Sequence, residues 1–234
     1  MKLTDYTTYA DAQAHYSSAR LCDLFSGDRK QLNLAYECID RHAAQGDRVA
    51  VRVIRADGND DILTFRQIAR ASSQFAHWLS DQGVQKGDCI CIMLEPSLAF
   101  YAAVFGAIKA GTIAVPLFTL FGPDGVRLRV EDCSPSVLIT NQDKWPTTRG
   151  LNGPAVHLDT DVMEAIQDYP ETFDVASAAN DLAAYQYTSG TTRELPDAVK
   201  HTHRAVVVVT NAALYATGVR PGDRFFCPSS PAWG

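Results

Sequence analysis

Short apolar strands alternate with helix-forming segments along most of this 234-residue chain. The run Cys89-Ile-Cys-Ile-Met-Leu94 has the length and composition of a buried strand, and Pro96 and Ser97 then open a helical segment that reaches Gly111. Another strand is predicted directly afterwards, over residues 112–118. This order predicts an α/β fold, in which a mixed but mostly parallel sheet is flanked by helices.

The other elements are predicted from periodicity, capping residues and turn signals. Helices are expected over 33–42 with Asn33 as the cap, over 65–82 with Thr64 as the cap, over 126–132, over 161–167, and from about His203 onward. Strands are expected at 48–54 and 62–65, joined as a hairpin, and at 136–140, 155–158, 183–187, 198–202 and 224–227. Residues 1–30 are mixed and polar, and we expect them to form a peripheral arm.

Composition narrows the classes of partner. The net charge is −6 and 21% of the residues are charged, so the chain has no excess of positive charge with which to bind nucleic acid. No run of eighteen apolar residues occurs, and the polar N-terminus lacks the features of a signal peptide, so we expect no membrane span and a cytoplasmic location. With 46% apolar residues the chain has enough material for a core.

The six cysteines are scattered without a CxxC pair. Zinc and a disulfide framework are therefore both disfavoured, and buried reduced thiols are the expected state. Cys89 and Cys91 are the nearest two, and their spacing places them on one face of the predicted strand.

The strongest candidate for a binding site is the segment Ala184-Tyr-Gln-Tyr-Thr-Ser-Gly-Thr-Thr192, in which a short strand leads into small hydroxylated residues. Gly190 lets the backbone approach a ligand closely, and the hydroxyls and amides around it offer neutral donors to an anion. On composition alone an ordinary turn is the commoner explanation. A P-loop is not supported because no Gly-Lys-Ser/Thr follows, and Ser189 lacks the Gly-x-Ser-x-Gly context of a hydrolase nucleophile.

A family resemblance raises the odds of a phosphate-binding role. The matching segments, in chain order, are Leu63-Thr-Phe65, Val84-Gln-Lys-Gly-Asp88, Ala107-Ile-Lys-Ala-Gly111, Val115-Pro-Leu117, Tyr187-Thr-Ser-Gly-Thr-Thr192, Leu195-Pro196 and His201-Thr-His-Arg204. Together they resemble the adenylate-forming enzymes, a superfamily that includes AMP-forming acyl-CoA synthetases. Residues 33–42 and 116–123 most resemble synthetases of the acetyl, medium-chain and benzoate type.

The resemblance implies activation of a small carboxylic acid or fatty acid by ATP and Mg2+, followed by acyl transfer to coenzyme A. It implies contacts to ATP from Thr188, Ser189, Gly190, Thr191, Thr192, Arg193 and Lys200, with Thr191 also near the magnesium ion, and a place for Trp233 in the carboxylate pocket. The arm would cover residues 1–30, and residues 31–234 would be part of an N-terminal adenylation domain.

Two departures from the family pattern bear on activity. The usual signature continues Gly-x-Pro-Lys-Gly, whereas here Asp197 and Ala198 stand where lysine and glycine are expected. Arg193 or Lys200 is a candidate for the missing charge, unless Arg193 is simply a surface residue. The family's later elements, including the catalytic lysine of its small C-terminal domain, are also missing. We therefore expect an N-terminal fragment that forms little thioester alone, with a complementing C-terminal segment as a candidate partner.

Other interpretations stay open at this point. The chain could be a non-catalytic remnant or interaction domain, or an adenylation module that loads a carrier protein. His201 and His203 are spaced for one face of a strand, but without a third ligand nearby a metal pair is disfavoured, and capping of the next helix by Thr202 or His203 is preferred. Tyr185 and Tyr187 are expected to pack in the core beside the loop.

Overall fold

The computed structural model describes all residues except 56, 188–196 and 233–234. Its main sheet has six strands in the order β6-β5-β3-β4-β7-β8. These are β3 (Cys89–Met93), β4 (Ile113–Pro116), β5 (Val137–Thr140), β6 (Ala155–Leu158), β7 (Leu182–Tyr187) and β8 (Ala198–Thr202). Strands β3 to β7 are parallel and β8 pairs antiparallel to β7, which confirms the predicted α/β class.

Strand β3 is buried along its whole length, so helices must cover both faces of the sheet. Its isoleucines, Ile90 and Ile92, enter one apolar cluster with α4 (Phe65–Asp81), α5 (Leu98–Lys109) and α8 (Asp159–Ala165). Its cysteines and Met93 enter a second cluster, against α6 (Pro123–Cys133). The alternation along β3 thus assigns each helix to a face.

The first strands form a separate two-stranded sheet, as the hairpin prediction requires. β1 (Val49–Ile54) pairs antiparallel with β2 (Asp60–Thr64), and α4 follows at once. The Thr64 hydroxyl accepts from the Gln67 amide at 3.2 Å, and the Gln67 side chain accepts from the Thr64 amide at 2.9 Å. This capping box fixes the start of α4 where the sequence predicts it.

The segment before the hairpin is a helix with an irregular centre. It runs through a π-helical stretch, Tyr36–Asp40, into α3 (Arg41–Ala43), and the Asn33 side chain accepts from the Tyr36 amide at 3.1 Å as its predicted cap. The π-helical stretch presents Asp40 to the Lys109 ammonium at 2.6 Å. Burial lowers the pKa of Lys109 and raises that of Asp40, and their pairing opposes both shifts.

Lys109 connects three helices from the end of α5. Its side chain is 1% exposed, and its ammonium also donates to the Ala69 carbonyl and the Ser73 hydroxyl, each at 3.0 Å. Because all three protons of the ammonium have acceptors, the charge is tolerated in the interior.

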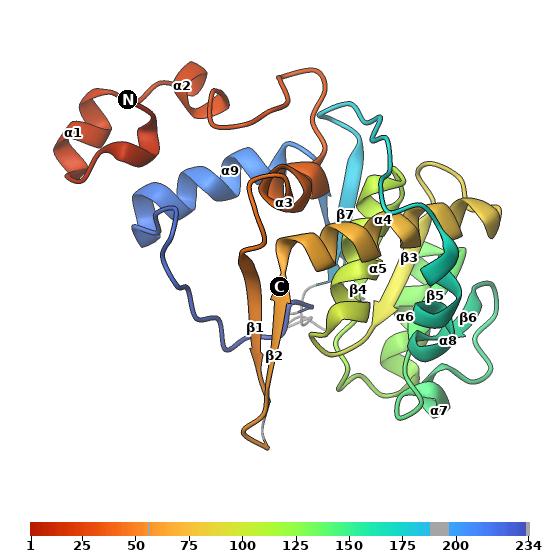
Figure 1. The fold of residues 1–234 in the computed structure, drawn as a ribbon. Helices are drawn as coiled ribbons and strands as arrows, with labels where there is room; N and C mark the ends of the chain where they lie inside the picture. Colours follow the sequence, from red (N-terminus) through yellow and green to blue (C-terminus); the bar gives the residue numbers. More distant parts are fainter. Residues whose placement is uncertain (56, 188–196, 233–234) are drawn as a thin grey trace.

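The N-terminal segment packs against the end of the described chain. A 3-10 turn (Leu3–Asp5), α1 (Tyr9–Ala14) and α2 (Ser18–Cys22) form a small cluster with Val207 of α9 (Ala205–Ala212) and with Tyr215 of the π-helical stretch that follows (Ala213–Thr217). Figure 1 shows α1 and α2 beside α9, away from the main sheet.

Some predicted boundaries are wrong. Helix α6 begins at Pro123 rather than 126, because proline suits the first helical position. The segment 224–227, expected as a strand, pairs with no other strand in the described part of the chain, and its Phe225 and Phe226 are 67% and 74% exposed. The short helical elements within residues 1–30 and α7 (Trp145–Thr148) were not predicted, and the helix expected over 161–167 is α8 followed by a 3-10 turn (Ile166–Asp168).

No helix in the described part of the chain has both the length and the apolar character that a membrane crossing requires.

The contact between α4 and α5 gives a test of the packing. A Cβ on Gly106 would lie 2.7 Å from the Ser72 carbonyl oxygen and 2.7 Å from a ring carbon of Phe75. We expect Gly106→Ala to lower the free energy of unfolding by about 1–3 kcal/mol, despite alanine's better helix propensity. Urea denaturation measures this value.

Gly125→Ala in α6 is the matched control, since the nearest atom to its Cβ would be Phe121 Cβ at 3.4 Å. It should leave stability unchanged or raise it by up to about 1 kcal/mol. Equal stability of the Gly106→Ala variant and the unmodified chain would contradict the close packing.

Candidate functional site

The carboxyl ends of the parallel strands β3 to β7 all meet one edge of the sheet. After β3 the chain places β4 on one side and β5 on the other, so the strand order reverses between β3 and β4. Ligands of open α/β sheets bind outside the carboxyl edge at such a switch point. The topology therefore selects the segments that follow β3, β4 and β7.

Glu95 and Thr119 join the two segments at the switch point. Glu95 follows β3 and is exposed, whereas Thr119 follows β4 and is 4% exposed. The Thr119 hydroxyl donates to the Glu95 carboxylate. The sequence did not single out this pair, although a carboxylate just after a buried strand was a usable signal. The contact places a carboxylate at the switch point on the carboxyl edge of the sheet.

The hydroxyl-rich loop leaves the same edge, next to β4. Strands β7 and β8 pair in register, with Tyr187 opposite Ala198. The loop therefore starts and returns at two neighbouring points of the carboxyl edge. The predicted phosphate-binding residues Thr188, Ser189, Gly190, Thr191, Thr192 and Arg193, and the predicted pocket residue Trp233, lie outside the described residues.

Tyr187 holds the entry to the loop. It is 3% exposed, its hydroxyl donates to Asp132 Oδ2 at 2.6 Å, and the Arg129 carbonyl oxygen lies 3.3 Å from the same hydroxyl. The Arg129 guanidinium lies 5.5 Å from the centre of the Tyr187 ring and 3.8 Å from that of Phe121. Burial and the hydrogen bond to Asp132 raise the pKa of Tyr187, so its phenol stays protonated and keeps donating. The predicted core packing of Tyr187 is confirmed.

Lys200 lies on β8 opposite Tyr185, and its ammonium is 5.2 Å from the centre of that ring. At about 3.3 Å per residue, its backbone is roughly 7 Å from the start of β8 at Ala198. The side chain of Lys200 is exposed, and so is Asp197, the residue just before β8. Lys200 thus lies two residues into β8, and its ammonium makes a cation–π contact with the Tyr185 ring.

His203 has a structural role. It follows β8, is fully buried, and its Nδ1 accepts from the Leu34 amide at 3.0 Å. Burial lowers the pKa of His203 to about 4. Among the described residues no group of three or more His, Cys, Asp or Glu could hold a metal ion. The predicted capping of α9 is wrong, because Arg204 is the cap residue and no side chain caps it.

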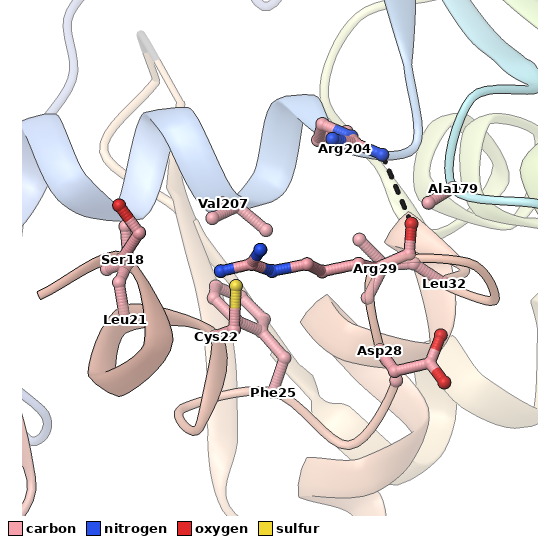
Figure 2. Close-up of a pocket in the computed structure, with 11 residues that line it drawn as sticks. Ser18, Leu21, Cys22, Phe25, Asp28, Arg29, Leu32, Ala179, Arg204 and Val207 are labelled. Atoms are coloured by element: carbon pink, nitrogen blue, oxygen red, sulfur yellow. Dashed lines mark hydrogen bonds between the residues drawn. The ribbon is translucent and has the colours of Figure 1, made fainter.

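A separate cavity of about 360 Å3 lies between α2 and α9, and its mixed lining includes the apolar Leu21, Phe25 and Val207 and the charged Asp28, Arg29 and Arg204 (Figure 2). Arg204 donates across it to the Arg29 carbonyl at 3.1 Å. Because β8 runs antiparallel to β7, the start of α9 is at the amino edge of the parallel strands. The cavity is therefore distinct from the candidate site.

Comparisons with known proteins find relatives in sequence. The sequence profile of the family described as AMP-binding enzyme matches residues 39–234. Acetyl-coenzyme A synthetase of Bacillus subtilis is 29% identical over 87% of this chain and 38% of its own length. The 3-hydroxybenzoate/4-hydroxybenzoate–CoA ligase of Thauera aromatica is 27% identical over 88% of this chain and 42% of its own.

A solved structure extends the similarity to the fold. The acyl-CoA synthetase of Brucella canis superposes on this chain with a TM-score of 0.87 at 27% identity, covering 97% of this chain and 44% of that one. The chain thus spans less than half the length of each of these three relatives.

The buried imidazole of His203 predicts an acid-sensitive fold. The pKa of His203 is about 4 in the folded state, below the ordinary 6.5. Between those pH values His203 therefore binds a proton in the unfolded state but not in the folded state. Stability should fall by about 3 kcal/mol from this residue as the pH drops from 6.5 to 4. Urea denaturation across that range measures the slope.

His203→Asn is the control, since its amide oxygen can still accept from Leu34 and cannot titrate. The variant should show a shallower loss of stability over the same interval. If the free energy of unfolding falls equally with pH in the two proteins, His203 is not buried in its neutral form.

Proposed function

This chain belongs to the AMP-binding enzyme family, and on that premise we propose that it forms the ATP-holding part of an AMP-forming acyl-CoA synthetase. The observation that supports the proposal most directly is that β7 ends and β8 begins at the carboxyl edge, beside the switch point. Tyr187, anchored on α6, fixes the strand end from which the loop departs.

The proposed reaction has two steps. A carboxylate oxygen attacks the α-phosphorus of ATP, and the bond to pyrophosphate breaks to leave an acyl-adenylate. The thiol of coenzyme A, losing its proton, then attacks the acyl carbon, and AMP departs. The first step brings anions together, so donors and a magnesium ion must offset their repulsion.

The donor chemistry of the loop fits this demand. Thr188, Ser189, Gly190, Thr191 and Thr192 would offer hydroxyls and amides to the β- and γ-phosphates, and Thr191 would also contact Mg2+. One residue before Tyr187, the buried side-chain nitrogen of Gln186 has no hydrogen-bond partner in the described structure. A protein of net charge −6 must bind such an anion through local groups of this kind.

A positive charge for the phosphates would come from Arg193 or Lys200. Lys200 is near the loop on β8, and a shift from the Tyr185 ring would free its ammonium. Arg193 lies within the loop sequence and could bind phosphate oxygens in a bidentate manner. Comparing Arg193→Ala with Lys200→Ala in a nucleotide-binding assay identifies the residue that replaces the family's lysine.

The acid would be a small carboxylic or fatty acid, with Trp233 in its pocket. The acetyl and hydroxybenzoate specificities in the names of the relatives belong to those proteins. Since the chain spans about two fifths of their length, we propose that turnover needs a complementing C-terminal segment that supplies the catalytic lysine. A non-catalytic remnant, or a module that loads a carrier protein, are the alternatives.

ATP–pyrophosphate exchange with a panel of carboxylates tests the proposal. We expect exchange from this chain joined to a complementing segment, and little or none from residues 1–234 alone. In the joined protein Thr191→Ala should reduce exchange roughly 100-fold, the usual effect of losing one positioned donor. The control is Thr217→Ala. The Thr217 hydroxyl is exposed and donates a hydrogen bond to the Ala213 carbonyl beyond α9, so its loss should leave exchange unchanged.

Exchange that is untouched by Thr191→Ala would remove the phosphate role of the loop. Exchange by residues 1–234 alone at the rate of the joined protein would show that the chain needs no complement. A joined protein that binds no nucleotide would favour the remnant interpretation.

A further inference from the structure

Three cysteines meet between β3 and the end of α6. Cys89 and Cys91 lie on one face of β3, and Cys133 is the last residue of α6; all three pack in the same apolar cluster. The sulfurs of Cys91 and Cys133 are 3.6 Å apart. The ATP-binding role proposed above uses none of these thiols.

The two sulfurs are close enough for a small movement to join them. A disulfide needs about 2.05 Å between sulfurs, so Cys133 would have to approach β3 by roughly 1.5 Å. Cys133 is the final helical residue, and Ser134 after it turns the chain in the left-handed region at φ 46°. A helix terminus can shift more easily than the buried strand opposite it.

The thiols differ in exposure and acidity, as a reactive pair requires. Cys133 is partly exposed, whereas Cys91 is fully buried. Hydrogen bonds from Cys89 and Cys91 lower the pKa of Cys133, and its thiolate in turn raises theirs, together with burial. By contrast, burial raises the pKa of Cys38 to about 11, which keeps that thiol unreactive. Low-pKa, accessible cysteines beside a second thiol are the ones that oxidants reach first.

Cys133 is also coupled to the entry of the β7–β8 loop. Its neighbour Asp132 accepts the hydrogen bond of the Tyr187 phenol at 2.6 Å. Tyr187 is the last residue of β7 and pairs with Ala198 across the base of the loop. Where the end of α6 moves toward β3 to close the gap between the sulfurs, the backbone of Asp132 moves with it and this anchor is disturbed.

We propose that Cys133 and Cys91 form a peroxide-sensitive thiol pair, whose oxidation to a disulfide releases Tyr187 from Asp132 and loosens the end of β7. If the loop holds ATP, as proposed above, oxidation then weakens nucleotide binding. Oxidation of this pair is thus a covalent modification that regulates nucleotide binding. Reduction by a thiol reductant returns the anchored state.

The chemistry balances with hydrogen peroxide as the oxidant. The Cys133 thiolate attacks one peroxide oxygen, the O–O bond breaks, and after protonation the products are a sulfenic acid and water. The Cys91 thiol then attacks the Cys133 sulfur, the S–O bond breaks, and the S–S bond forms as a second water leaves. Two thiols lose two electrons in total, and the peroxide gains them.

Peptide mass spectrometry of the full chain after peroxide treatment tests the bond. We expect a peptide pair linked through Cys91 and Cys133, absent in Cys133→Ser and in Cys91→Ala, and restored to thiols by dithiothreitol. Cys89→Ala is the matched control on the same strand and face, and it should still form the link. A link to Cys89, or oxidation confined to the exposed Cys227, would overturn the proposal.

Amide hydrogen exchange tests the coupling without any nucleotide. Oxidation should make exchange at Gln186 and Tyr187 roughly tenfold faster, as expected for the loss of one hydrogen bond. Tyr187→Phe should reproduce this change in the reduced chain, and Cys91→Ala should be unaffected by peroxide. Unchanged exchange in a chain that carries the disulfide would overturn the coupling.

Nucleotide affinity is measured separately, in the protein joined to its complement. Weaker ATP binding after oxidation, but not in Cys91→Ala, supports the regulatory role, and unchanged binding removes it. Failure of the reduced protein to bind ATP would count against the proposed function alone, because the disulfide and the exchange results do not depend on it.

Discussion

Strand β3 is buried on both faces, and this burial organises the sheet, the helices and the candidate site around it. A dry central strand must find all its backbone partners in neighbouring strands, here β4 and β5, and must be covered by helices on each side. Its alternating side chains direct α4, α5 and α8 to one face and α6 to the other. The close approach at Gly106 and the enclosed ammonium of Lys109 follow from packing two helices tightly over this strand.

The same arrangement brings the segments of the candidate site to the carboxyl edge of the sheet. Parallel strands end together, so the segments after β3, β4 and β7 converge although they are far apart in the sequence. Glu95 and Thr119 meet across the switch point, and α6 holds Tyr187 at the base of the loop. Helix α6 therefore has two functions: it covers one face of the sheet and it positions the entry to the candidate ATP site. That double role is why a thiol at its end can influence the loop.

Sequence patterns located most elements correctly because their signals are local. Thr64 and Gln67 lie within one turn, and the apolar run of β3 needs no distant partner to be recognised. The prediction of a strand at 224–227 was wrong for the complementary reason. Its aromatic residues suit a strand, but a strand exists only where another chain segment supplies its hydrogen bonds, and the described residues supply none there.

Local sequence patterns were sufficient for the α/β class, the caps at Asn33 and Thr64, the face shared by Cys89 and Cys91, and the family resemblance of residues 187–192. The pairing of Lys109 with Asp40, the hydrogen bond from Tyr187 to Asp132, and the approach of Cys133 to Cys91 were found only in the folded chain. Periodicity and capping act over one or two turns of chain, whereas these contacts join residues 42 to 69 positions apart. Their geometry is set by how helices pack on the sheet, which no local pattern specifies.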